Sequence, residues 1–291
     1  MDTMYALLMK KNWNQKEPFL TPTLVNYYLQ ATAGEINDLA FPYKIDAIVI
    51  FPGYLSKSNT NIERFWFKFF YNVNKKVDCI IAEGMNGNSK KNLGLTLKDN
   101  VKEIKKYTKS TPLLIPSSKD HSKSIFFLQC KDKDKDKDKD KDKDKNGSFT
   151  DALRSCCKTI PSDSNSSKEI DNVSKENKEH DKELLKENKV EFNKKIFSSD
   201  IEENFEIKAI LVGSSNLSYQ TYCKSPADKG EKDVFLFDAK NERIAKEFKA
   251  QIMKKCSSSS SDILLFKEVE KIDLHKIMND EIDELESCYE F

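Results

Sequence analysis

Two stretches decide the fold of this chain: Ile207 to Ser218, with the sequence IKAILVGSSNLS, and Asp120 to Phe127, with the sequence DHSKSIFF. In each of them a short polar cluster adjoins a run of β-branched, aliphatic or aromatic residues. This pattern is typical of a strand that carries polar groups to the edge of a sheet. The two stretches therefore predict two strands whose polar ends form one site.

The polar residues at these strand ends are of the types that a phosphodiester site requires. His121 and Lys123 are two positions apart, so their side chains point to the same face of a strand. Ser214 and Asn216 share a face in the same way, and Gly213 permits a tight backbone path before them. An imidazole can attack phosphorus, a lysine can neutralise its non-bridging oxygens, and Asn and Ser can donate hydrogen bonds to them.

The HxK pair at 121 and 123, followed by a strand and then by GSSN at 213–216, resembles the signature of the phospholipase D superfamily, HxKxxxxD followed by GSxN. Within that superfamily the chain is similar to the nuclease-type members, which have one motif per chain. It departs from the pattern at Leu128, where the family has Asp. The interval also differs, since His121 and Asn216 lie 95 positions apart, but polar or low-complexity residues 131–203 account for 73 of these.

The resemblance implies a role for each of five residues. His121 would be the nucleophile, Lys123 and Asn216 would hold the phosphoryl oxygens, and Ser214 would assist them. Glu231 stands just before the apolar run DVFLF, where the family carries an acid that supports the histidine. The reaction would need no cofactor and no metal. Because one chain offers one well-placed histidine, the resemblance implies a homodimer with two copies of His121 at its centre.

The other two histidines of the chain match the pattern less well than His121. His180-Asp181-Lys182 is a second HxK pair, but it lies in a highly charged segment with no apolar strand beside it. His275 is followed two positions later by Ile277, so it does not match the pattern. His121 is therefore the expected nucleophile.

Composition limits the classes of partner and site. The net charge of +1 argues against a general field that attracts nucleic acid, so such binding needs a local groove. The seven cysteines form no CxxC or CxxH pattern, which favours reduced thiols over a disulfide framework or a zinc site. No window approaches the ~20 apolar residues of a membrane span. We expect a cytoplasmic protein without a membrane span.

The chain divides by composition into a core and three less regular segments. Residues 44–130 and 204–255 are expected to form the phospholipase D-like domain, with 1–43 as an N-terminal extension and 256–291 as a C-terminal tail. Residues 131–203 are expected to be a disordered insert, because the tract 131–145 alternates Lys and Asp and offers no apolar residue to bury. An insert of this length is tolerated at a hairpin tip, since loop-closure entropy grows only logarithmically with length.

Within the core, apolar periodicity predicts an alternating α/β order. Strands are expected at 44–51, 77–82 and 112–115, separated by helices at 61–73 and 97–108. A strand at 233–237 and a helix at 241–255 follow the GSSN segment. The aromatic run 61–73 is interpreted as core packing rather than as a platform for stacking bases. Two helical crossovers between strands imply a mixed sheet with helices on both faces.

Three functions are consistent with these residues. A metal-independent nuclease is favoured, with DNA as its substrate, because single-motif relatives are largely nucleases and no membrane-anchoring element is visible. The alternatives are a phospholipid phosphodiesterase and an inactive module that keeps a phosphate pocket for binding. Because Leu128 replaces the motif Asp, the inactive binding module is not excluded as an alternative.

Overall fold

The computed structural model describes most of the chain outside the long polar segment. The described residues are 3–10, 21–36, 39, 41–56, 59–73, 76–82, 84, 93–115, 122–131, 157–159, 190–192, 194–222, 232–255 and 263–286.

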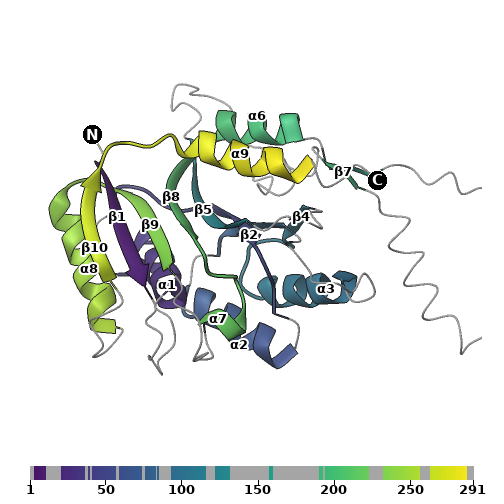
Figure 1. The fold of residues 1–291 in the computed structure, drawn as a ribbon, viewed down its shortest axis with the longest axis horizontal. Coiled ribbons are helices and arrows are strands. Elements are labelled where there is room, and N and C mark those ends of the chain that lie inside the picture. The colour runs from purple at the N-terminus through teal and green to yellow at the C-terminus, as the bar shows by residue number, and fades with distance from the viewer. Residues whose placement is uncertain are drawn as a thin grey trace, which may run out of the picture.

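One mixed sheet organises these residues, with its eight strands in the order β10-β1-β9-β8-β5-β2-β3-β4 (Figure 1). The strands are β1 (Thr3–Lys10), β2 (Ala47–Pro52), β3 (Asp78–Ala82), β4 (Leu113–Ile115), β5 (Lys123–Cys130), β8 (Phe205–Gly213), β9 (Lys232–Ala239) and β10 (Ile263–Val269). The neighbours β2-β3 and β3-β4 are parallel, and the other neighbours are antiparallel. Two further short strands, β6 (Cys157–Thr159) and β7 (Val190–Phe192), pair only with each other in a separate antiparallel sheet.

Helices cover both faces of the large sheet. They are α1 (Thr21–Thr32), α2 (Asn59–Phe70), α3 (Leu93–Ile104), α6 (Lys194–Asn204), α7 (Tyr219–Tyr222), α8 (Glu242–Lys255) and α9 (Leu274–Glu286). Figure 1 shows α6 and α9 together on one side, while α1, α2, α3 and α8 lie on the other. No described helix is long and apolar enough to cross a membrane.

The core lies in two layers because the central strands are buried on both faces. Every residue of β2 and of β3 is buried, as their continuous apolar sequences predict. One layer packs these strands against α1, α2, α3 and α8, and Tyr28 stands at its centre with its ring against Phe127 and Phe235. The other layer packs the opposite face of the sheet against Phe197 and Ile201 of α6 and against one side of α9.

The predicted α/β order and the mixed sheet with helices on both faces are confirmed. The strands expected at 44–51, 77–82 and 112–115 correspond to β2, β3 and β4, and the helices expected between them correspond to α2 and α3. The strand expected at 233–237 is β9, and the helix at 241–255 is α8.

The sheet also includes residues outside the segments expected to form the core. Strand β1 lies between β9 and β10, so residues from both predicted terminal segments complete the sheet. Residues 194–203, which were expected within the disordered insert, form most of α6, and its Phe197 and Ile201 are fully buried. Helix α6 was missed because its sequence KKIFSSDIEEN has few apolar residues and adjoins a long polar run.

Candidate phosphodiester site

The ends of β5 and β8 bring the two sequence motifs to the same edge of the sheet. These strands are antiparallel neighbours, with Ser124 opposite Val212. The start of β5, at Lys123, is therefore adjacent to the end of β8, at Gly213. His121 lies outside the described residues, just before Ser122, and Glu231 lies outside them just before β9.

Lys123 and Asn216 converge on Gly53, the residue that follows the neighbouring strand β2. Gly53 has a φ of +62°, a conformation that side-chain-bearing residues rarely adopt. A Cβ atom on this residue would lie 2.7 Å from Asn216 Oδ1 and 2.8 Å from Lys123 Cγ. A side chain at this position would therefore collide with both Lys123 and Asn216, so the absence of one leaves room for them.

A backbone hydrogen bond fastens the GSSN loop to the same strand end. The amide of Leu217 donates to the carbonyl of Pro52 at 2.9 Å. In the register of β2 and β5, Pro52 lies opposite Lys123. Three separate segments of the chain are therefore tied together around Lys123 and Asn216.

The buried carboxylate of Asp233 holds the other side of the loop. Asp233 is 1% exposed and lies opposite Gly213, where a Cβ atom would be 2.2 Å from its Oδ1. It accepts a hydrogen bond from the backbone amide of Ser215 at 3.3 Å and one from Thr21 Oγ1 at 3.0 Å. Sequence reasoning missed Asp233 and Thr21. The sequence did carry a signal for Asp233, because this acid stands at the start of an apolar strand, two positions after Glu231.

The hydroxyl of Ser214 is engaged by the backbone of Lys232. It accepts from the Lys232 amide at 2.9 Å and can donate to the Lys232 carbonyl at 3.3 Å. The Ser214 amide donates to the same carbonyl at 2.9 Å. Ser214 therefore joins the ends of β8 and β9, whereas Asn216 lies beside Gly53.

At this edge Ser124 Oγ and Asn216 Oδ1 are buried without a hydrogen-bond partner within the described part of the chain. An unsatisfied buried polar atom costs about 1–3 kcal/mol, so its presence in a native structure calls for an explanation. Ser124, Ser215, Lys123 and Asp233 line a small hollow that has no room for a water molecule as it stands. Binding of a phosphate oxygen there would require side chains to move apart, and the Ser124 hydroxyl would then donate a hydrogen bond to it. Asn216 Oδ1 accepts hydrogen bonds and would need a donor instead, so Asn216 would hold a phosphate oxygen through its Nδ2 amino group.

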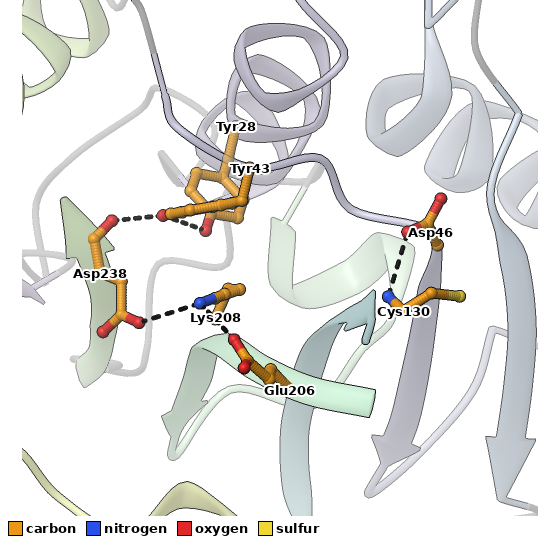
Figure 2. Close-up of polar contacts among 7 residues, drawn as sticks. All are labelled: Tyr28, Tyr43, Asp46, Cys130, Glu206, Lys208 and Asp238. Atoms are coloured by element: carbon orange, nitrogen blue, oxygen red, sulfur yellow. Dashed lines mark hydrogen bonds and ion pairs between the residues drawn. The ribbon is translucent and has the colours of Figure 1, made fainter. Parts of the chain in front are cut away.

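Leu128, at the position of the motif Asp, is fully buried in the core layer under α6 and α9. Lys123 is on the opposite face of β5, because five positions along a strand reverse the side-chain direction. A carboxylate does lie at the C-terminal end of β5, near Leu128, but it belongs to Asp46. Asp46 Oδ2 accepts a hydrogen bond from the Cys130 amide at 3.1 Å (Figure 2). Leu128 therefore contributes to packing and not to the candidate site.

A larger cavity, of about 490 Å³, opens at the opposite ends of β5 and β8, beside the first turn of α9. Three of its charged groups pair with one another: Lys208, which is 9% exposed, lies 2.6 Å from Glu206 Oε2 and 3.9 Å from Asp238 Oδ2 (Figure 2). The hydrogen bond and charge of Lys208 lower the pKa of Glu206. Tyr43 donates its hydroxyl hydrogen to the Asp238 carbonyl, and its ring lies under the Lys208 ammonium.

His275 also lines this second cavity. Burial, followed by the charge of Lys131, lowers its pKa, so the imidazole is neutral near pH 7. This cavity is at the edge of the sheet opposite Lys123 and Asn216. His180 lies outside the described residues.

Known proteins provide no closer definition of the site, because no family model matches the chain and no curated protein matches it.

Proposed function

We propose that the chain is a phosphodiesterase that cleaves nucleic acid through a covalent phosphohistidine, as its resemblance to the phospholipase D superfamily implies. The observation that carries this proposal is the convergence of Lys123 and Asn216 on Gly53. These are a cation and an amide, the two groups that would hold the non-bridging oxygens of a phosphodiester. They come from segments separated by the long polar part of the chain, and Lys123 is two positions after His121.

The first step would be an in-line attack by His121. An imidazole nitrogen forms a bond to phosphorus while the bond from phosphorus to the leaving oxygen breaks. His121 of a second copy donates a proton to that oxygen, which leaves as an alcohol. Lys123 and Asn216 stabilise the negative charge that accumulates on the non-bridging oxygens, and Glu231 orients the attacking imidazole.

The second step would release the enzyme. The neutral imidazole of the second copy takes a proton from water as the water oxygen bonds to phosphorus. The bond between phosphorus and His121 then breaks, so the phosphoryl group leaves as a phosphomonoester. Because both histidines must meet at one phosphorus, the proposal includes an isologous homodimer whose two-fold axis passes through the site.

Cleavage assays on the full-length protein test this function. The substrates are labelled single-stranded DNA, duplex DNA, RNA, phosphatidylcholine vesicles and bis(p-nitrophenyl) phosphate, each with and without EDTA. We expect His121→Ala to lower kcat at least about a thousandfold, and Lys123→Ala about a hundredfold or more. The matched control is His180→Ala, which removes the histidine of the other HxK pair and is expected to leave cleavage unchanged.

Four results would contradict the proposal. Cleavage that EDTA abolishes, or that persists in His121→Ala, would exclude the phosphohistidine route. Cleavage of the vesicles alone would favour the phospholipid phosphodiesterase. Oligonucleotide binding without cleavage under any condition would favour the inactive binding module, and acid-labile labelling of His121 by a ³²P substrate would argue against that module.

A further inference from the structure

The aromatic run of α2 divides into a buried set and an exposed pair. Phe65, Trp66 and Phe69 are fully buried in the core, as expected. Phe67 is 46% exposed and Tyr71, just after the helix, is 49% exposed. Their ring centroids are 4.7 Å apart, so the two rings form one aromatic surface. Among the described residues, these are the aromatic members of a small set of exposed large hydrophobic side chains.

Cationic side chains lie beside these rings. Arg64 precedes Phe67 by one helical turn, and Lys68 precedes Tyr71 by three positions, so these neighbours lie on adjoining parts of the helix surface. The exposed acid on this part of α2 is Glu63, which interacts electrostatically with Arg64 and with Lys106, two positions after the end of α3. The two cations Arg64 and Lys68 against the one acid Glu63 leave this part of α2 with a net positive charge.

This surface begins next to the candidate site. Arg64 Nη1 donates to the hydroxyl of Tyr219 at 3.4 Å, and Tyr219 begins α7, three positions after Asn216. Figure 1 shows α7 beside α2 at the end of β8. At 1.5 Å per residue, the rise from Arg64 to Tyr71 is about 10 Å. Arg64, Phe67, Lys68 and Tyr71, which we name the α2 strip, therefore lead away from the site over the length of a few nucleotides.

We propose that the α2 strip binds the single-stranded part of a nucleic acid substrate, with bases stacked on Phe67 and Tyr71 and phosphates held by Arg64 and Lys68. This rests on the proposed function, and it specifies the substrate as single-stranded. Stacking on an exposed ring needs an unpaired base whose face is free, and a duplex hides those faces inside its own stack. The phosphates between the stacked bases would then lie beside Arg64 and Lys68, as phosphates lie beside cations in other grooves that bind single strands.

Binding assays on the full-length protein test the α2 strip directly. Fluorescence anisotropy is measured with a 20-nucleotide oligothymidine, the same length of abasic strand, a matched duplex and an oligouridine. The variant is Phe67→Ala combined with Tyr71→Ala. The matched control is Leu265→Ala, which truncates a side chain that is also 49% exposed but lies on the edge strand β10. We expect Kd for both single strands to rise about tenfold or more in the double variant and to stay unchanged in the control.

The abasic strand separates stacking from charge. It should bind wild type and the double variant equally, because it retains phosphates but has no base to stack. Arg64→Gln combined with Lys68→Gln should weaken both the normal and the abasic strand and reduce the salt dependence of binding. The proposal would be overturned if removing the rings weakened binding of the normal and the abasic strand equally. It would also be overturned if the protein bound duplex more tightly than single strand.

A comparison of two substrates distinguishes this proposal from the function on which it rests. In the ring variant, which combines Phe67→Ala with Tyr71→Ala, kcat/KM for the oligothymidine should fall at least about tenfold because KM rises. The value of kcat/KM for bis(p-nitrophenyl) phosphate should stay unchanged. If the ring variant cleaves oligothymidine as efficiently as wild type, the proposed role of the α2 strip in single-strand binding is wrong, while the phosphodiesterase proposal is unaffected. Ring-dependent binding in a protein that cleaves neither substrate would overturn the phosphodiesterase instead.

Discussion

Gly53 is the residue at which backbone conformation and candidate chemistry meet. Its positive φ turns the chain sharply after β2, and its missing side chain lets Lys123 and Asn216 approach. Asp233 has the complementary role on the other side of the GSSN loop, because its carboxylate holds the Ser215 amide and the Thr21 hydroxyl. Neither residue needs to touch a substrate to determine where Lys123 and Asn216 lie.

Gly53→Ala should therefore damage the site more than the fold. The new methyl group would lie within 3 Å of Asn216 and Lys123, and a displacement of about 1 Å can lower a rate about a hundredfold. Gly34→Ala is the matched control, since Gly34 also has a positive φ, +74°, but has nothing within 4 Å of its Cβ position. Both variants should lose about 1–2 kcal/mol of unfolding free energy from the strained φ.

Urea unfolding and cleavage of bis(p-nitrophenyl) phosphate measure the two effects separately. Equal cleavage by Gly53→Ala and Gly34→Ala would mean that the close approach at Gly53 has no role in the site.

Local patterns predicted several elements well and missed the residues whose role depends on distant partners. The continuous apolar runs of β2 and β3 and the polar ends at Lys123 and Asn216 could be recognised because each lies within a few neighbouring positions. Gly53 and Asp233 could not, because their contacts come from strands far apart in sequence. His121 and Glu231 stay predictions, since they lie outside the described residues.

At the scale of elements, α6 shows how a helix with little apolar surface can still be required. Two side chains, Phe197 and Ile201, fill the layer between the sheet and α9. The flanking residues Lys194 and Asp283 join α6 to α9 by an ion pair of 2.8 Å. The apolar content of α6 was too low to mark a buried helix from sequence alone, because tertiary contact and not helix pattern supplies its stability.

Phe197→Ala should lower the free energy of unfolding by about 3–5 kcal/mol, since it removes a fully buried aromatic ring. The neighbouring residue Ile196 is 39% exposed, so Ile196→Ala is the control and should cost less than about 1 kcal/mol. Urea denaturation followed by circular dichroism measures both. Similar small costs for the two variants would show that α6 does not stabilise the sheet in solution.

At the scale of the whole molecule, β10 and α9 complete both the sheet and one core layer. Strand β10 covers β1, and Leu274, Met278 and Ile282 of α9 are buried against the opposite face from α1 and α2. The composition of residues 256–291 indicated only a tail with one element, because the pairing partner of β10 lies at the other end of the chain.

Truncation after Lys255 should therefore abolish a cooperative thermal transition and cause aggregation, since it uncovers β1 and a core layer. Truncation after Glu286 is the control and should leave the transition unchanged, because it retains β10 and α9. Circular dichroism on heating and size-exclusion chromatography measure these outcomes. A monomeric, cooperatively melting protein without β10 and α9 would show that the remaining strands suffice for the fold.

The position of β1 has a consequence for biosynthesis. The ribosome makes Met4 and Leu8 before the strands with which they pair, since Met4 pairs with Asp238 and Val269, and Leu8 with Val234 and Leu265. At about 5–20 residues per second, β1 waits for many seconds before either partner strand emerges. During that interval its apolar side chains have no sheet to enter, so we expect the nascent chain to need protection from aggregation until β9 and β10 have been made.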